Sequence, residues 1–143
     1  MLAVMPKGCP LFYGHCVQTV TLYHADFAGG DYACRRVVVP RVYLEFKKNC
    51  NVDKTGRTEA NSFLLVIPQA SCRFVLPAEY KGAAGTYTLE PGDKVLLGEG
   101  PELPTREAWA ALLPAGVYGL AVVQNIDVKY WQGTICHVEA GGA

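Results

Sequence analysis

The residues best suited to metal binding or nucleophilic catalysis are scattered along this 143-residue chain, which contains six cysteines and three histidines. Structural zinc sites usually combine two closely spaced pairs of ligands. The nearest cysteines are Cys9 and Cys16, with His15 beside the second, and the chain has no C-x-x-C sequence. We therefore predict no metal site and no cofactor, and expect reduced cysteines that pack as small apolar side chains.

Cysteine–histidine catalysis needs a nucleophile within reach of a base, and Cys136 directly precedes His137. Adjacent residues of a β-strand point to opposite faces of the sheet, so these side chains should not meet. The chain also lacks the local signatures that surround catalytic cysteines in known families. We predict no catalytic residues and no enzymatic activity. The alternative from a different functional class is a small ligand- or metal-binding β-barrel that uses its cysteines and histidines.

A phosphate-binding loop is the other chemistry to consider, in the stretch YTLEPGDKVLLGEG at residues 87–100. A P-loop needs G-x-x-x-x-G-K-[ST], and a dinucleotide-binding loop needs G-x-G-x-x-G at the start of a helix. Neither pattern occurs here. Pro91 and Gly92 suit the central positions of a turn between two alternating runs, which predicts a β-hairpin. Glu90 and Asp93 are then expected to be solvated turn charges.

A basic segment is the strongest candidate for a contact surface. The sequence KKNCNVDKTGRTEAN at residues 47–61 is polar and contains turn-forming residues, so it is predicted to be a long loop. Such a loop could bind DNA phosphates or acidic groups of a neighbouring subunit, and a simply solvated loop is the alternative. The candidate oligomer or channel contacts are Lys47, Lys48, Asn49, Asp53, Lys54 and Arg57.

Composition limits the class of protein. Half of the residues are hydrophobic, 18% are charged, and the 13 basic and 13 acidic side chains cancel. A chain of this size and composition is expected to form one domain over residues 1–143, with residues 1–15 a candidate for an extended N-terminal arm. Zero net charge gives no support for wrapping nucleic acid. No secretion signal is expected, because Pro6, Lys7, Gly8 and Pro10 interrupt the apolar start, and no apolar run approaches the roughly 18 residues that a membrane span needs.

Strand patterns dominate the chain, so the candidate cysteines, histidines and basic residues are expected to lie on or between β-strands. Residues 16–25, 33–46 and 62–68 are rich in β-branched and aromatic residues, with Pro40 expected at an edge, a bulge or a bend. One short helix is predicted at 105–113, with Thr105 as N-cap and an apolar stripe of Trp109, Leu112 and Leu113. Two strands with a turn near residues 129–133 complete the pattern. The predicted fold is all-β, a small barrel or sandwich of about six to eight strands.

The order of these segments resembles a family of small proteins of uncharacterised-domain type in phages and prophages of Firmicutes. The matching stretches are NSFLLVIP, LPAEYKG, GTYTLEPGDKVLLGE and QNIDVKYWQGTICHVEAGG, in that order. Members of the family have a Y-x-L-x-x-G-D hairpin and end with V-x-D and H-W-x-V-x-G. Here Val138 stands where the family usually has Trp after its His. The resemblance covers residues 17–142, and the order and spacing of the motifs carry it.

The resemblance implies a virion structural protein at the head–tail junction, assembled in the host cytoplasm. It implies a small β-barrel that forms a homo-oligomeric ring in the neck, in a head-completion or stopper role. Neighbouring neck proteins on the portal or adaptor side and on the tail side would be its partners, with transient contact to DNA in the channel. A tail-terminator or tail-completion role is the alternative of similar size and fold. We expect the basic segment at 47–61 to project towards the channel or an adjacent subunit.

Overall fold

The computed structural model describes residues 13–27, 30–53, 56–114 and 116–142, with the backbone alone for residues 48–53 and 56–61. The strands are β1 (Gln18–Asp26), β2 (Ala33–Asp53), β3 (Gly56–Pro68), β4 (Arg73–Phe74), β5 (Thr86–Tyr87), β6 (Lys94–Leu97), β7 (Leu120–Val122), β8 (Asn125–Trp131) and β9 (Thr134–Gly142). Seven of them form one antiparallel sheet in the order β7-β6-β1-β2-β3-β9-β8. No helix in the described part of the chain is long and apolar enough to cross a membrane.

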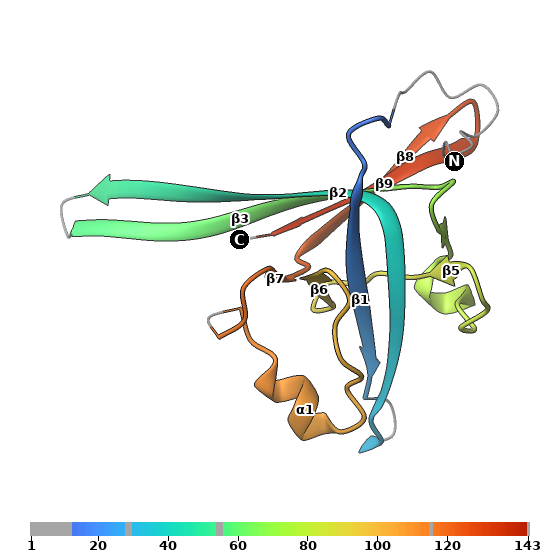
Figure 1. Ribbon diagram of the computed structural model, residues 1–143, viewed down its shortest axis with the longest axis horizontal. Coiled ribbons are helices and arrows are strands. Elements are labelled where there is room, and N and C mark those ends of the chain that lie inside the picture. The colour runs from blue at the N-terminus through green and yellow to red at the C-terminus, as the bar shows by residue number, and fades with distance from the viewer. Residues whose placement is uncertain (1–12, 28–29, 54–55, 115, 143) are drawn as a thin grey trace.

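Strand β2 is strongly bent and thereby belongs to two halves of the sheet (Figure 1). Its first half pairs with β1 and its second half with β3. The register against β1 shifts so that Pro40 and Arg41 together oppose Thr19, and Arg41 has a φ of 56°. A proline cannot donate to the ladder, and a bulge bends the strand that contains it. Of the three alternatives expected at Pro40, the structure shows a bulge within one continuous strand.

The hydrophobic core lies between the two halves of the sheet. Val20, Leu22 and Val95 from one half pack in the same cluster as Leu65 and Val138 from the other. The all-β class with one short helix is confirmed. The sheet does not close into a barrel, and its halves enclose the core as the layers of a sandwich do.

The β-hairpin predicted between residues 86 and 99 is wrong. Strand β5 pairs in parallel with β4, whereas β6 lies between β1 and β7. The turn itself is present, because the amide of Asp93 donates to the carbonyl of Glu90 over 3.1 Å and Gly92 has a φ of 98°. A type II turn requires positive φ at this position, which glycine supplies. The turn therefore carries the chain from one sheet to another.

Helix α1 (Arg106–Ala111) begins where the sequence predicts it. The hydroxyl oxygen of Thr105 accepts from the amide of Ala108 over 3.1 Å, which satisfies one of the free amides of the first turn. Trp109 and Leu112 pack on a second cluster formed by Tyr23, Leu96, Leu103 and Leu120. Leu113 is 54% exposed, so the predicted apolar stripe is only partly buried. The C-terminal hairpin of β8 and β9 is also confirmed, with Gln132 and Gly133 at its turn.

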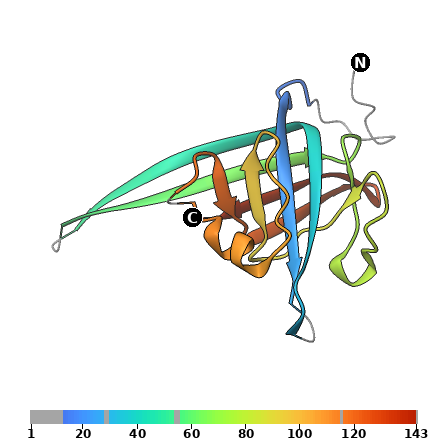
Figure 2. The same ribbon diagram turned by 60° about the horizontal axis from the view of Figure 1, so that its bottom comes forward.

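The segment predicted to be a loop at residues 47–61 is instead regular β structure. Strands β2 and β3 continue as an antiparallel pair from Tyr43↔Val66 to Asp53↔Gly56. The outer part of this hairpin extends away from the rest of the molecule in both views (Figures 1 and 2). Polar composition indicated a loop, but an antiparallel pair that lies outside the core needs no apolar face.

Candidate functional site

The outer part of the β2–β3 hairpin is the most distinctive surface of the protein. We call residues 47–53 and 56–62 the projecting hairpin. Its seven residue pairs run from Lys47↔Ser62 to Asp53↔Gly56. At the usual rise per residue, the six steps between the first and last pair span about 20 Å.

The projecting hairpin is two-stranded throughout its described length. Strand β1 pairs with β2 only up to Val42, and β9 pairs with β3 only from Phe63 onwards. Both outer edges of the projecting hairpin therefore lack a neighbouring strand among the described residues. A two-stranded hairpin alone is marginally stable in water, and a third strand or a packing partner is what usually stabilises it. Among the described residues, the projecting hairpin therefore has neither of these stabilising features.

The structure brings the predicted contact residues together on this hairpin. The ladder places Lys47 opposite Ser62, Lys48 opposite Asn61, Asn49 opposite Ala60, Arg57 opposite Val52 and Asp53 opposite Gly56. Lys54 lies outside the described residues. The predicted residues are therefore distributed along the whole projecting hairpin, and their role in contacts stays a prediction.

Charge is unevenly divided between the hairpin and the body. Residues 47–62 contain four basic side chains (Lys47, Lys48, Lys54, Arg57) and two acidic ones (Asp53, Glu59), which gives +2. The whole chain has 13 of each, so the remaining residues have nine basic and eleven acidic side chains and a charge of −2. The positive charge of the hairpin is therefore balanced by a small negative excess spread over the rest of the chain.

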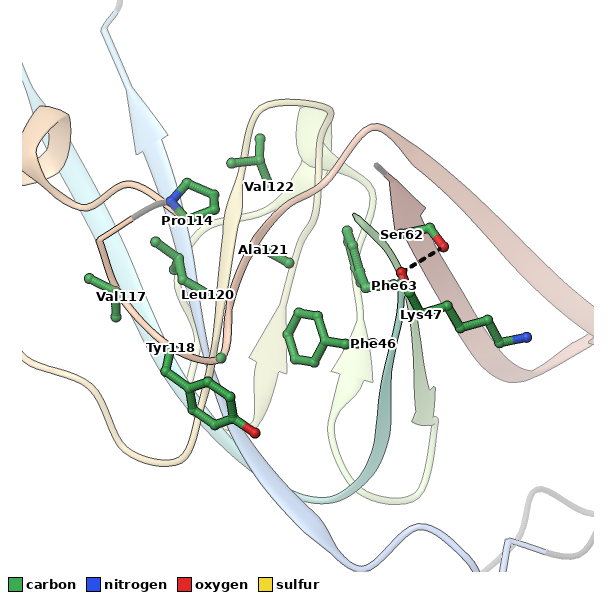
Figure 3. Close-up of a pocket in the computed structure, with 11 residues that line it drawn as sticks. Phe46, Lys47, Ser62, Phe63, Pro114, Val117, Tyr118, Leu120, Ala121 and Val122 are labelled. Atoms are coloured by element: carbon green, nitrogen blue, oxygen red, sulfur yellow. Dashed lines mark hydrogen bonds between the residues drawn. The ribbon is translucent and has the colours of Figure 1, made fainter. Parts of the chain in front are cut away.

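An apolar groove of about 310 Å³ opens at the root of the projecting hairpin. Figure 3 shows the rings of Phe46 and Phe63 on one side and the segment from Pro114 to Val122 on the other. Tyr118 is 93% exposed and Phe46 is 43% exposed, although both line this groove. Sequence reasoning did not identify the groove, because its walls come from segments that lie more than 50 residues apart in the chain. An exposed apolar surface of this kind is a common mark of an interaction site.

A chain of polar contacts fixes the first described residues against β9. The hydroxyl of Tyr13 lies 2.7 Å from Nδ1 of His137, whose Nε2 lies 3.1 Å from Oε2 of Glu139. Lys129 continues the chain, with its Nζ 3.9 Å from the same carboxylate oxygen and 2.6 Å from Oδ2 of Asp127. Tyr13 is thereby held on the sheet by residues 124 positions away. This arrangement fixes the place where the N-terminal segment reaches the body.

Burial makes three of the described cysteines less reactive than a free thiol. Burial raises the pKa of Cys72 to about 11, and it also raises the pKa values of Cys16 and Cys34. A thiolate is the reactive form, so raised values make these thiols poor nucleophiles at neutral pH. Cys136 is buried, while the neighbouring His137 contacts Tyr13 and Glu139. Within the described residues, no three cysteine, histidine or acidic side chains are grouped so that they could hold a metal ion.

Asp93 was expected to be a solvated turn charge, and this expectation is wrong. The residue is only 4% exposed, and its carboxylate accepts from the amide of Glu90 over 2.8 Å. The same carboxylate binds Nδ1 of His24 at 2.9 and 3.1 Å. The expected hydrogen bond to its own turn is present, but the histidine partner comes from β1 and had no local sequence signal.

Residues 15–143 match the model of a family of unknown function, DUF6751. The chain therefore belongs to this family. No curated protein and no solved structure matches the chain.

Proposed function

We propose that this protein is a structural virion protein of a tailed bacteriophage and forms a head–tail connector ring in the neck, in a head-completion or stopper role. The order of motifs from Val17 to Gly142, which resembles such proteins, suggests the setting. The projecting hairpin is the observation that carries the assembly role, since it is a two-stranded extension with both edges uncovered among the described residues. The protein acts through its contacts and has no catalytic residues in this proposal.

The geometry of the hairpin favours a heterologous contact. The hairpin and the body are different surfaces, and repeated contact between two different surfaces closes into a ring when the rotation permits. The hairpin carries +2 and the remaining residues carry −2, so a hairpin that lies on the body of the next copy brings opposite charges together. The neighbouring subunit also supplies the packing that a two-stranded hairpin needs. Neck proteins on the portal or adaptor side and on the tail side would cover the two rims of the ring.

DNA in the channel is a secondary partner in this proposal. The basic residues Lys47, Lys48, Lys54 and Arg57 can contact phosphates as DNA passes. A chain without net charge is poorly suited to stable DNA binding, which depends on the release of counterions from many phosphates. We therefore assign the hairpin mainly to the adjacent subunit.

Removal of the projecting hairpin tests the proposal. Lys47 and Ser62 are paired, so an Asn-Gly turn in place of residues 48–61 closes a shorter hairpin with a favourable two-residue loop. The shortened protein should keep its circular dichroism spectrum and thermal transition but remain monomeric by native mass spectrometry. The full-length protein should form rings that are visible in negative stain. Rings of unchanged stability without the hairpin would refute its role.

A matched variant separates the shape of the hairpin from its charge. Substitution of Lys47, Lys48, Lys54 and Arg57 by Gln keeps the length of the hairpin and removes its positive charge. Weakened rings in this variant would indicate that charge contributes to the contact between subunits.

Localisation of the protein by antibody labelling of purified particles decides between the two neck roles. Label at the capsid vertex of tailless heads supports the stopper, and label on free tails supports a tail terminator.

A further inference from the structure

We infer that the apolar groove at the root of the projecting hairpin binds the apolar N-terminal segment of a neighbouring copy. The inference rests on the proposed ring and identifies a second contact within it. The occupant is the segment Met1–Met5, with the sequence MLAVM. It lies outside the described residues, and the inference uses only its amino-acid sequence.

The groove has the shape and chemistry of a site for a few aliphatic side chains. Its walls include Phe46, Phe63, Val117 and Leu120, and its volume is about 310 Å³. Tyr118 stands at its margin with 93% of its surface exposed (Figure 3). Filling the groove would remove this surface from water, and each square ångström of apolar surface buried contributes about 25 cal/mol.

The segment is complementary to the groove in composition. All five residues of MLAVM are apolar, and Pro6 follows directly. A proline disfavours the helical conformation for the residue before it, so Pro6 does not favour continuation of a helix from this segment. Methionine side chains are flexible and fill irregular apolar spaces well.

The position of Tyr13 determines which copy supplies the segment. Tyr13 lies beside Tyr43 and Val66 around a second pocket and binds His137. Alternation along β3 places Val66 on the face opposite to Phe63, Leu65 and Ile67, which point to the core. Tyr13, the first described residue, therefore lies on the outer face of the sheet. The groove opens on the other side of that sheet.

The two sites also lie at opposite ends of the same strands. Tyr13 is near the pair Pro68↔His137, whereas the groove is near Phe63↔Gly142. Five residue steps separate these pairs, or about 17 Å. Eight residue steps separate Tyr13 from Met5 and reach at most about 29 Å when fully extended, so a path along the strands and round the edge of the sheet would use most of that length. The N-terminal segment of a neighbouring copy would not need to pass round the edge of this sheet, because it would approach the groove from the solvent side.

Photo-crosslinking between isotopically distinct copies tests this inference. The full chain is prepared with benzoylphenylalanine at position 118, in unlabelled and in ¹⁵N-labelled form, and the two forms are mixed before assembly. After irradiation and trypsin digestion, the residue at 118 should be linked to the peptide Met1–Lys7. About half of the linked pairs should combine a light with a heavy peptide. A crosslinker at Tyr130, which is exposed on the edge strand β8, is the control and should not capture this peptide.

The outcomes separate the inference from the proposed function. Linked pairs that are only light–light or heavy–heavy would mean that the segment occupies its own groove, which overturns the inference. Rings without any link to Met1–Lys7 would overturn it as well and would leave the ring proposal intact. A protein that stays monomeric at every concentration would contradict both. As an independent measurement, Leu2→Asp with Val4→Asp should raise the protein concentration needed for half-assembly at least tenfold, and Ala3→Ser should not.

Discussion

The imidazole of His24 binds the carboxylate of Asp93 through Nδ1, at 2.9 and 3.1 Å from its two oxygens. Asp93 also accepts from the amide of Glu90, so one carboxylate holds the Pro91–Gly92 turn closed and ties it to β1. The pair lies where β1 and β6 meet, because Tyr23 pairs with Lys94 in the ladder. The predicted hairpin turn is therefore held to β1 by the hydrogen bonds between His24 and Asp93.

This pair predicts a pH dependence of stability. The hydrogen bond to Asp93 raises the pKa of His24 above its value in the unfolded chain, despite the opposing effect of burial. The resulting stabilisation is complete below the unfolded pKa of about 6.5 and is lost as the pH rises through the folded pKa. We expect the free energy of unfolding in urea to fall by about 1–2 kcal/mol across this range. His24→Gln should remove that part of the pH dependence, and an unchanged profile would contradict the assignment.

The loop after β6 predicts a strict requirement for glycine at position 100. The amide of Gly100 donates to the hydroxyl oxygen of Thr21 over 2.8 Å, and its carbonyl accepts from Nε of Arg36 over 2.8 Å. A Cβ here would collide with the hydroxyl of Tyr23 and a methyl group of Leu96. Gly100→Ala should destabilise the protein by about 1–3 kcal/mol, because the tightly packed neighbours must move.

Gly116 provides the control for that substitution. A Cβ at Gly116 meets only the carbonyl oxygen of Leu113, at 3.9 Å. The thermal midpoint of Gly116→Ala should therefore stay close to that of the parent, while that of Gly100→Ala should fall by several degrees. Equal thermal midpoints for the two variants would show that the loop around Gly100 can rearrange to accept a Cβ without loss of stability.

Lys94 is predicted to hold helix α1 on the sheet. The residue is 6% exposed, and its ammonium group donates to the carbonyls of Trp109 and Leu112, both at 2.6 Å. It also lies 4.4 Å from the centre of the Trp109 ring. Cations near the C-terminus of a helix stabilise it. Lys94→Met should cost about 1–3 kcal/mol in urea unfolding and change the tryptophan fluorescence of the folded state, since both carbonyls lose the ammonium donor. Lys81→Met, at an exposed position, should do neither.

Alkylation should distinguish the cysteines by their burial. Cys72 is buried, and its pKa is raised to about 11, so little of it is thiolate at pH 8. Iodoacetamide at pH 8 should label Cys72 at least tenfold more slowly in the native protein than in urea, as measured by peptide mass spectrometry. Rapid native labelling would mean that the β4–β5 region opens readily.

Sequence periodicity was sufficient for the elements that pack on the core. The alternation in β1, the run SFLLVIP in β3, the irregular pairing at Pro40 and the cap at Thr105 were all predicted, because each depends on local residue preferences or on one buried face. Two features were not predictable in this way. The partners of β5 and β6 are set by residues distant in the chain, and the projecting hairpin has a polar sequence that patterns assign to a loop.

Only part of the candidate site could be predicted from the sequence, because the rest depends on contacts between distant segments. The basic residues from Lys47 to Arg57 could be recognised by their charge alone. The groove beside them exists only when Phe46 and Phe63 meet the segment around Tyr118. Likewise, no local pattern indicates that His24 and Asp93, separated by 69 positions, are partners. Long-range pairing creates both features.

The continuity of β2 through the bulge at Pro40 has a mechanical consequence. One strand runs from the β1 partnership, through the second half of the sheet, to the end of the projecting hairpin. Ladder hydrogen bonds lie across the strand direction, so a pull along the hairpin loads many of them together in shear. The projecting hairpin is thus continuous with the core through β2. Force applied at its tip would be shared by the hydrogen bonds of both halves of the sheet and would not break them one at a time.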